Sequence, residues 1–517
     1  MINFNNIHKA YFLGIGGIGM SAIARYLNAN GIEIHGYDRE NTDLTEQMIS
    51  EGMKIHFEEN IEKIPQKIDL VIYTPAIDRN NKEFKFLNSK GLLIKKRSEI
   101  LNEITKDNFL IAIAGTHGKT SISSIISHIF NKAGIACTSF IGGISKNIDS
   151  NLQYTENSKV FIVEADEFDR SFLTLNPNIA LISSIDADHL DIYGNYENLL
   201  QSFALFANKI KPGGKLIIKS GLNLLTAFSG EKLTYSFNSE ANYHASNYKF
   251  SGVKSHFDLI KNSKKLDEFT FPIPGDHNIE NAVAAITVAL EYGINISSIK
   301  SALESYSGVK RRFEYRLNTD KLVYIDDYAH HPNELKAIIS SVRQLYPKKK
   351  ITGIFQPHLF SRTRDFADEF AKNLELLDEI ILLEIYPARE KPIEGVNSNL
   401  IFDKIKNKNK KVFSNLELFA ELENNKKEQA NLVKENISQL VNDWENKILK
   451  CSSNGRLTKS LHYEAKDNDK SAERLLQKHD AKIEGLWPTL DSMRNVEDNA
   501  LMQSTGFYEP PNCGDQE

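Results

Sequence analysis

Residues 111–126 read IAIAGTHGKTSISSII, an apolar run that enters a glycine-bearing turn and continues into a helix-compatible segment. A buried strand followed by a helix is the repeating unit of parallel α/β sheets. The same order recurs at the start of the chain, in HKAYFLGIGGIGMSAIARYL, and further strand-like runs end in polar loops at KVFIVEADE and NIALISSI. We therefore expect an α/β protein built on parallel sheets.

The turn in this first stretch has the properties of a phosphate-binding loop. Gly115 and Gly118 allow a tight turn that exposes N–H groups at the positive end of the following helix. Lys119 can place a charge on phosphates, and Thr120 can ligate Mg²⁺. The common pattern G-x-x-x-x-G-K-[ST] would need glycine where Ile113 stands, so a plain strand-to-helix turn is the alternative.

Two further candidates follow strands that we expect to end at the same edge of that sheet. Glu164 closes the strand in VFIVEADEFD, where a carboxylate can hold Mg²⁺. Asp166 and Glu167 follow it, and some of these acids must be solvated. His189 follows the next strand, and although a lone histidine is more often structural, this position makes it a candidate ligand for a second metal.

The glycines of GIGGIGMS match a different motif. Gly14, Gly16 and Gly19 fit G-x-G-x-x-G, and Asp38 lies at the end of the next strand. By itself this dinucleotide fingerprint suggests NAD. The same geometry binds other diphosphates, so beside a separate ATP domain a UDP-sugar is the better prediction.

Composition restricts the class of protein. A chain of 517 residues exceeds one core, and a prior of roughly 150 residues per domain suggests three or four domains. The formal net charge of -5 offers no general attraction to nucleic acid. We expect no membrane insertion, because no apolar run approaches the roughly 20 residues that span a bilayer. The sparse cysteines form no metal spacing and suit a cytoplasmic protein.

Local patterns predict several other elements. Residues 231–275 alternate polar and aromatic side chains and suggest antiparallel strands, and DHNIENAVAAITVALEYG predicts a helix with Asp276 as its N-cap. Pro332 stands where another helix can begin. Residues 424–450 carry an apolar stripe at helical spacing, whereas residues 451–517 are polar and show little periodicity.

Two loops of the third segment gather polar side chains after strands. Arginine forks in such loops can hold a carboxylate, such as that of an amino acid. A single loop of this kind can be plain surface, but two of them at strand ends of one domain favour a site. The first, IDDYAHHP, carries Asp326, Asp327, Tyr328, His330 and His331, and the second, FQPHLFSRTRDF, carries His358, Arg362 and Arg364.

Taken in order, these motifs resemble one family. AGTHGKTS, VEADE, DHNIENA, RRFEY, DDYAHHP and FQPH-x-FSRT are similar to the Mur ligases of bacterial cell-wall synthesis, over roughly residues 7–400. GIGGIGMS and YPARE-x-PI-x-GV favour the member that joins L-alanine to UDP-N-acetylmuramate. The family's loop is the shorter G-T-x-G-K-[ST] form, so Ile113 is no defect. The resemblance implies ATP and Mg²⁺ or Mn²⁺ as cofactors, and a monomer or weak dimer.

The resemblance also implies a domain plan and site residues. The domains are a UDP-sugar-binding Rossmann-like domain at 1–106, a central P-loop-type ATPase domain at 107–309, a Rossmann-like C-terminal domain with an atypical end at 310–450, and a tail of unknown role at 451–517. The implied catalytic residues are Lys119, Glu164 and His189, and the implied metal ligands are Thr120, Glu164 and His189. The implied ATP-binding residues are Gly115, Thr116, His117, Gly118, Lys119, Thr120, Ser121, Asn278, Asn281, Arg312, Asp327 and His330. The implied UDP-sugar-binding residues are Gly14, Gly16, Gly17, Gly19, Met20, Ser21 and Asp38, and the implied amino-acid side comprises His331, His358, Arg362 and Arg364.

Two departures from the family pattern leave alternatives open. Leu359 stands where many relatives have arginine, and we find no closing strand with a G-A-G-D turn after Lys411. An inactive ligase-like protein is therefore one alternative. A Mur-type ligase that adds a preformed peptide to the same sugar is another. An NAD oxidoreductase would leave Lys119 and Glu164 unexplained.

Overall fold

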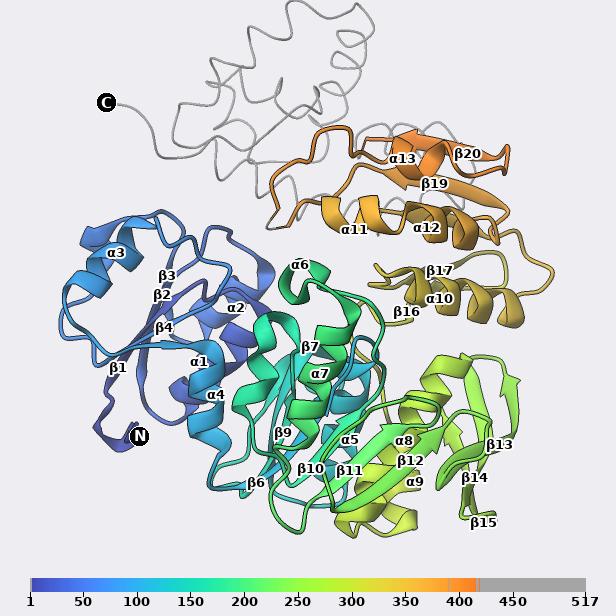
Figure 1. Ribbon diagram of the computed structural model, residues 1–517, viewed down its shortest axis with the longest axis horizontal. Coiled ribbons are helices and arrows are strands. Elements are labelled where there is room, and N and C mark those ends of the chain that lie inside the picture. Colours follow the sequence, from blue (N-terminus) through green and yellow to red (C-terminus); the bar gives the residue numbers. More distant parts are fainter. Residues whose placement is uncertain (1, 389, 415–417, 419–517) are drawn as a thin grey trace, which may run out of the picture. The chain divides into compact units, whose positions relative to one another are not determined.

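The computed structural model describes residues 2–388, 390–414 and 418. These divide into two compact units (Figure 1). Unit 1 comprises residues up to 315 together with 325–351 and 368–377, and unit 2 comprises 316–324, 352–367 and the residues from 378 onward.

The strands have the following bounds: β1 (Lys9–Leu13), β2 (Glu33–Tyr37), β3 (Lys54–His56), β4 (Leu70–Tyr73), β5 (Ile94–Lys96), β6 (Phe109–Ala114), β7 (Cys137–Ser145), β8 (Ser150–Gln153), β9 (Val160–Glu164), β10 (Ile179–Ile182), β11 (Lys215–Lys219), β12 (Glu231–Ser236), β13 (Tyr243–Ser251), β14 (Lys254–Lys261), β15 (Lys264–Phe271), β16 (Glu314–Asn318), β17 (Val323–Asp326), β18 (Thr352–Phe355), β19 (Glu379–Leu383) and β20 (Lys410–Phe413).

The α-helices have the following bounds: α1 (Ile18–Ala29), α2 (Asp43–Ser50), α3 (Lys82–Ser89), α4 (Arg97–Thr105), α5 (Lys119–Lys132), α6 (Leu190–Tyr193), α7 (Tyr196–Ala207), α8 (Asp276–Tyr292), α9 (Ile296–Glu304), α10 (Pro332–Leu345), α11 (Phe360–Asp365), α12 (Ala367–Leu374) and α13 (Asn399–Phe402). Short 3₁₀ helices are η1 (Phe4–Asn6), η2 (Ile61–Lys63) and η3 (Phe168–Thr174).

The first sheet of unit 1 is parallel throughout and has the order β3-β2-β1-β4-β5. Its central strand β1 is almost wholly buried, and Phe12 and Ile72 from neighbouring strands are fully buried in its core. The strand, glycine turn and helix predicted for the start of the chain are confirmed as β1, the turn after Leu13, and α1.

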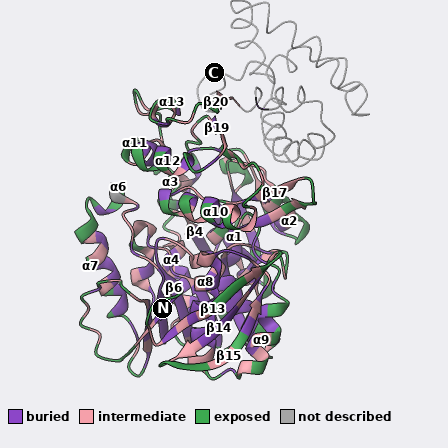
Figure 2. Ribbon diagram, turned by 90° about the vertical axis from the view of Figure 1, so that its right-hand side faces the viewer, coloured by how far each residue is buried: buried purple, intermediate pink, exposed green. Residues whose placement is uncertain are grey.

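The second sheet of unit 1 has the order β15-β14-β13-β12-β11-β10-β6-β9-β7-β8. β6 lies between β9 and β10 and runs parallel to both. Their carboxyl ends therefore meet at one sheet edge, which confirms the expectation that Gly115 and Glu164 emerge side by side. Figure 2 shows buried residues concentrated around β6 and α8, where the isoleucines of α5 and the alanines of α8 have almost no exposed surface.

Two local predictions in this sheet need correction. β13, β14 and β15 are antiparallel as expected, but β12 pairs in parallel with β11 and with β13. Asp276 is the first residue of α8 and not its N-cap, which is Gly275 at φ 106° and ψ 142°. A glycine adopts that conformation without a Cβ penalty, so the helix begins one residue earlier than the side-chain rule predicts.

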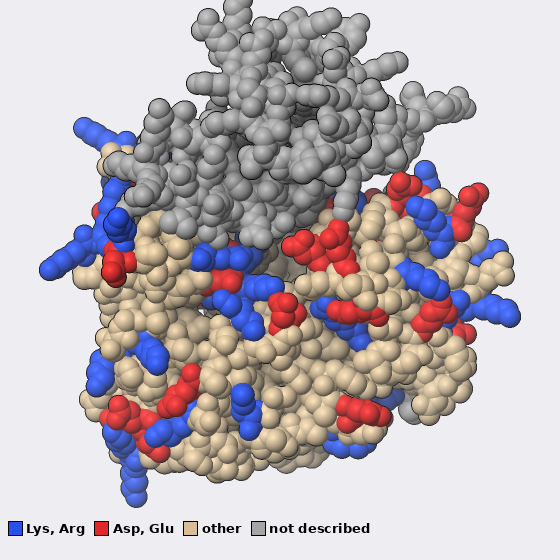
Figure 3. All heavy atoms as spheres, turned by 180° about the vertical axis from the view of Figure 1, so that it is seen from behind, with Lys and Arg blue, Asp and Glu red and all other residues tan. Residues whose placement is uncertain are grey.

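Unit 2 contains the parallel sheet β18-β19-β20. The strand expected before the loop FQPHLFSRTRDF is confirmed as β18, whereas β20 was not identified from the sequence. The predicted helix at 424–450 and the tail at 451–517 lie outside the described residues. Among the described helices, none combines the length and apolar character needed to cross a membrane. Acidic and basic side chains are interspersed on the face drawn in Figure 3.

Candidate active site

The turn between β6 and α5 has the backbone of an anion-binding loop. Gly118 is the N-cap of the 14-residue helix α5 and has φ 82°. A Cβ at this position would lie 2.7 Å from Oδ1 of Asn281, so the site requires glycine and Asn281 lies against the loop. The first N–H groups of an α-helix have no partner within the helix, which favours a phosphate at the start of α5.

Lys119 is largely shielded from solvent, with 12% of its side chain exposed. Its Nζ donates to the carbonyl of Gly115 at 2.6 Å and lies 2.8 Å from Oε2 of Glu167. The side chain of Glu167 is 1% exposed. Burial disfavours the ammonium charge, but Glu167, Asp166 and Glu164 outweigh burial and raise the pKa of Lys119. The ammonium is therefore held charged inside the loop.

Thr120 and Glu164 form the second contact of the site. Thr120 Oγ1 donates to Glu164 Oε2 at 2.9 Å, and the N–H of Gly142 donates to the same oxygen at 3.0 Å. A Cβ on Gly142 would collide with the Glu164 carboxylate, so only glycine permits this approach. A hydroxyl and a carboxylate side by side are oxygen donors that fit Mg²⁺.

Protein ligands alone do not complete a metal centre here. Within the described part of the chain, no group of three or more histidine, cysteine, aspartate or glutamate side chains is arranged to hold a metal ion. Mg²⁺ is commonly bound by one or two carboxylates together with substrate phosphates and water. The Thr120–Glu164 pair therefore suits a metal that arrives with a nucleotide.

His189 lies close to the same carboxylate as Lys119. Its Nε2 is 3.9 Å from Oε1 of Glu167 and 3.8 Å from Oδ2 of Asp188, and its ring contacts the edge of Phe168. The structure thus brings Lys119 and His189 to the same carboxylate of Glu167. The metal-binding role of His189 stays a prediction.

Two serines after β10 fasten the loop, and the sequence reasoning missed both. The N–H of His117 donates to Ser184 Oγ at 2.7 Å, and Thr116 Oγ1 lies 2.9 Å from the same oxygen. Ser183 Oγ donates to the carbonyl of His117. The phrase SSID directly after a buried strand was the only local signal for these contacts.

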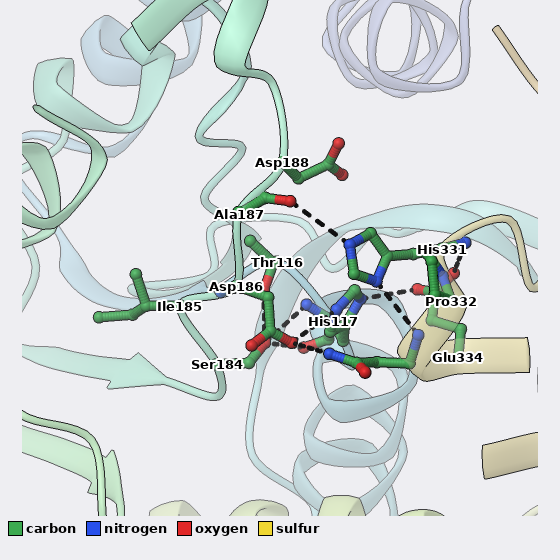
Figure 4. Close-up of polar contacts among 12 residues, drawn as sticks. Thr116, His117, Ser184, Ile185, Asp186, Ala187, Asp188, His331, Pro332 and Glu334 are labelled. Atoms are coloured by element: carbon green, nitrogen blue, oxygen red, sulfur yellow. Dashed lines mark hydrogen bonds and ion pairs between the residues drawn. The ribbon is translucent and has the colours of Figure 1, made fainter. Parts of the chain in front are cut away.

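The side chain of His117 joins three segments of unit 1. Figure 4 shows its imidazole between the segment after β10, which carries Asp186, and the start of α10, which carries Glu334. Nε2 lies 2.9 Å from Asp186 Oδ2, and Nδ1 lies 3.0 Å from Glu334 Oε1. The sequence named His117 as a loop residue but identified neither carboxylate partner.

The segment before α10 places Asp327 in a half-buried position. Its two carboxylate oxygens accept from the N–H groups of Phe313 and Ala329, at 2.7 and 2.8 Å. Burial raises the pKa of Asp327 to about 6, although Arg312 acts in the opposite direction. Arg312 therefore lies close enough to Asp327 to act on its charge. The nucleotide contacts of both residues stay a prediction.

The two histidines of this segment are engaged locally. His330 Nδ1 lies 2.8 Å from the carbonyl of Tyr328. His331 is the N-cap of α10, where its Nδ1 accepts from the N–H of Asn333, and its Nε2 lies 3.4 Å from the carbonyl of Ala187. His331 therefore caps the start of α10 and places it against the segment that carries Ala187. Its role on the amino-acid side stays a prediction.

Asn278 and Asn281 have different surroundings although one motif carries both. Asn278 is buried and its Nδ2 donates to the carbonyl of Pro274 at 2.8 Å, which supports the first turn of α8. Asn281 lies one helical turn further on and faces Gly118. Of the two, only Asn281 borders the loop in this structure.

The glycine turn after β1 has the predicted fingerprint geometry. Gly14 has φ 82°, and the N–H of Gly16 donates to Asp38 Oδ2 at 2.7 Å. Burial raises the pKa of Asp38. Ser21, predicted to face the UDP-sugar, is buried and accepts a hydrogen bond from Asn151 Nδ2 at 2.8 Å, so its hydroxyl fastens α1 to β8.

In unit 2, three of the predicted amino-acid-side residues lie in or directly before α11, namely His358, Arg362 and Arg364. Arg362 is 5% exposed, and its guanidinium lies 3.3 Å from His358 Nδ1. Arg364 pairs with Asp365 at 2.7 Å. Leu359 is buried with φ 73°, so the position where relatives carry arginine is an apolar N-cap in this chain.

Comparison with known protein families matches three consecutive stretches. Residues 9–109 match a model described as the Mur ligase family catalytic domain. Residues 113–289 match the Mur ligase middle domain, and residues 311–438 match the Mur ligase glutamate ligase domain. The expected three-domain α/β architecture is confirmed.

Two curated relatives match over most of their length. The UDP-N-acetylmuramate–L-alanine ligase of Christiangramia forsetii is 46% identical over 416 residues, which cover 79% of this chain and 90% of the relative. The enzyme of the same name from Flavobacterium psychrophilum is 48% identical over 421 residues, covering 81% and 92%.

Two solved structures share the fold. The UDP-N-acetylmuramate–alanine ligase of Thermotoga maritima superposes with a TM-score of 0.69 at 28% identity, covering 80% of this chain and 92% of that one. A murein peptide ligase of Psychrobacter arcticus superposes with a TM-score of 0.61 at 21% identity, covering 82% and 94%. The latter similarity concerns the fold alone.

Proposed function

The chain belongs to the Mur ligase family, and we propose that it joins L-alanine to UDP-N-acetylmuramate with conversion of ATP to ADP, in the synthesis of peptidoglycan precursors. The observation that carries this proposal is the identity of 46–48% to ligases of that name over 90–92% of their own length. The phosphate loop with Lys119 and the adjoining Thr120–Glu164 pair supply the site that such a reaction needs.

A carboxylate is a poor acyl donor, so the reaction has to activate it. The lactyl carboxylate attacks the γ-phosphate of ATP, ADP leaves, and an acyl phosphate forms. The neutral amine of L-alanine then attacks the carbonyl carbon, the C–O bond to phosphate breaks, and the amine loses its proton. Catalysis of phosphoryl transfer is mostly a matter of position and charge.

Residues of unit 1 are our candidates for binding the phosphates of ATP and the metal ion. Lys119 places its ammonium on the transferring phosphoryl group, and the N–H groups at the start of α5 hold the phosphates. Thr120 and Glu164 would hold Mg²⁺, which when bound neutralises phosphate charge. Asn281, beside Gly118, contacts the nucleotide from α8.

The first sheet binds the diphosphate of the sugar nucleotide. The turn at Gly14 and Gly16 follows β1, and Asp38 fixes the N–H of Gly16. A diphosphate can then sit at the start of α1, as in dinucleotide-binding folds. His358, Arg362 and Arg364 are our candidates for the carboxylate of L-alanine.

The test is ADP release with UDP-N-acetylmuramate, ATP and Mg²⁺, with the amine varied. L-alanine should give turnover at least tenfold above glycine, L-serine and a peptide that begins with L-alanine. Faster turnover with the peptide would assign the chain to peptide addition instead. Absence of ADP release with every amine, in protein that still binds ATP, would identify an inactive ligase-like protein.

A further inference from the structure

His117 lies between two acidic groups that come from different parts of unit 1. Asp186 Oδ2 is 2.9 Å from its Nε2, and Glu334 Oε1 is 3.0 Å from its Nδ1. The side chain of His117 is 18% exposed and that of Glu334 is 14% exposed. An imidazole with a carboxylate at each nitrogen can donate to both only as the imidazolium.

The two carboxylate oxygens of Glu334 contact different segments, the phosphate loop and the start of α10. Its Oε1 contacts His117, whereas its Oε2 accepts from the N–H of His330 at 3.1 Å and of His331 at 3.3 Å. The phosphate loop and the backbone at His330 therefore both contact the single side chain of Glu334. A capping glutamate needs only the second of these contacts.

Asp186 makes a parallel connection. Its Oδ2 accepts from Asn333 Nδ2 at 3.0 Å, and its backbone N–H donates to Thr116 Oγ1 at 3.1 Å. The segment after β10 is thereby tied to α10 on one side and to the phosphate loop on the other. His117 closes this arrangement through Glu334.

The surrounding charges are consistent with an imidazolium. Burial opposes protonation of His117, but the ion pair with Asp186 and the hydrogen bond with Glu334 outweigh it and raise the pKa to about 9. The bond to His117 lowers the pKa of Asp186 to about 2. His331, whose ring centre is 4.7 Å from that of His117, is the facing basic group, and burial lowers its pKa.

We propose that His117 is a positioning residue, and that its clamp between Asp186 and Glu334 fixes the phosphate-binding loop and the segment before α10 in one geometry for ATP. None of the three side chains needs to touch the reacting atoms. Their effect passes through the loop backbone at Gly115–Gly118 and through Asp327 and His330. The inference rests on the proposed ATP site but not on the identity of the amino acid.

A purely structural salt bridge would behave differently. Its loss, like the loss of the clamp, would lower the melting temperature, but it would affect every substrate equally. A positioning clamp predicts a selective effect on ATP, because only the nucleotide contacts both elements that the clamp joins.

The experiment is a double-mutant cycle with Glu334→Gln and His117→Gln in the full chain. Binding of a non-hydrolysable ATP analogue with Mg²⁺ is measured by calorimetry, and KM is measured for ATP and for UDP-N-acetylmuramate. Glu334→Gln keeps an oxygen acceptor for the N–H groups of His330 and His331. The matched control is Glu291→Gln, which removes a carboxylate paired with Lys215 and Lys261 away from the loop.

We expect each single variant to weaken analogue binding about tenfold, and the double variant also about tenfold rather than about a hundredfold. The KM for the sugar nucleotide should stay within twofold, and Glu291→Gln should bind the analogue as the wild type does. Additive losses in the double variant would show that His117 and Glu334 act separately and would overturn the proposal. So would unchanged binding in both single variants.

A second readout reports on His117 itself. In protein labelled with ¹⁵N-histidine, the His117 imidazole should remain protonated at pH 8 in the wild type and lose its proton in Glu334→Gln. A neutral His117 in the wild type at pH 8 would contradict the clamp even if the variants lost activity. If the wild type failed to ligate L-alanine yet bound the analogue through the clamp, the proposed function would fall and this inference would stand.

Discussion

The ammonium of Lys119 lies 2.8 Å from the carboxylate of Glu167, which is almost completely removed from solvent. Breaking a buried pair by removing one partner leaves an uncompensated charge and costs about 3–5 kcal/mol. We therefore expect Lys119→Met to abolish ligation and also to lower the free energy of unfolding by about that amount, measured by urea denaturation.

The double variant Lys119→Met/Glu167→Gln separates the two effects. Without a charge on Glu167 the stability should largely return, whereas ligation should stay absent because the phosphates still lack the ammonium. Recovered turnover in the double variant would remove Lys119 from the reaction.

Glu164→Gln should raise the Mg²⁺ concentration needed for half-maximal ADP release about tenfold or more. An amide is a weaker ligand than a carboxylate for a hard cation, yet it can still accept from Thr120 and Gly142. Glu280→Gln, whose carboxylate pairs with Lys219, is the control. An unaltered Mg²⁺ titration in Glu164→Gln would exclude this residue from the metal site.

The stability of the protein should depend on pH through His117. Its folded pKa of about 9 lies above the ordinary value of 6.5, so its contribution is fully present below about pH 6.5 and is lost as the pH rises through about 9. That difference corresponds to about 3.5 kcal/mol at about 1.4 kcal/mol per unit. The melting temperatures of wild type and His117→Asn should differ most near pH 6 and converge above pH 9. A gap that widened with rising pH would refute the assignment.

The N-terminal sheet should bind a sugar nucleotide and not NAD. Calorimetry is expected to show binding of UDP-N-acetylmuramate, and Asp38→Ala should weaken it because the N–H of Gly16 loses its acceptor. Tight binding of NAD with no response to the UDP-sugar would reverse this prediction.

Truncation tests how much of the C-terminal region the enzyme needs. A stop after residue 411 removes Val412 and Phe413 from β20, which pair with Leu382 and Leu383 of β19, so activity should be lost. A stop after residue 450 should preserve catalysis, because the polar sequence beyond it offers little apolar surface to bury. Loss of all activity in a soluble chain ending at 450 would contradict this.

Most of the elements that position the site were predictable because they depend on neighbours in the chain. An apolar run followed by glycines and a helix-compatible segment defines β6, the loop and α5, and the same logic applies to β1 and α1. Two local predictions were wrong. The N-cap of α8 is Gly275 and not Asp276, because glycine adopts the required backbone conformation. β12 pairs in parallel with β11, and strand pairing depends on residues distant in the chain.

The sequence by itself determined which chemical groups stand at strand ends and in what order, and this was enough to indicate a Mur-type ligase. Only the tertiary structure decided their partners. Lys119 meets Glu167 across 48 residues, and His117 meets Glu334 across 217. Periodicity reports which face of an element is buried, but a buried charge pairs with whichever opposite charge the packing of distant elements brings within reach, because an unpaired charge there would be too costly.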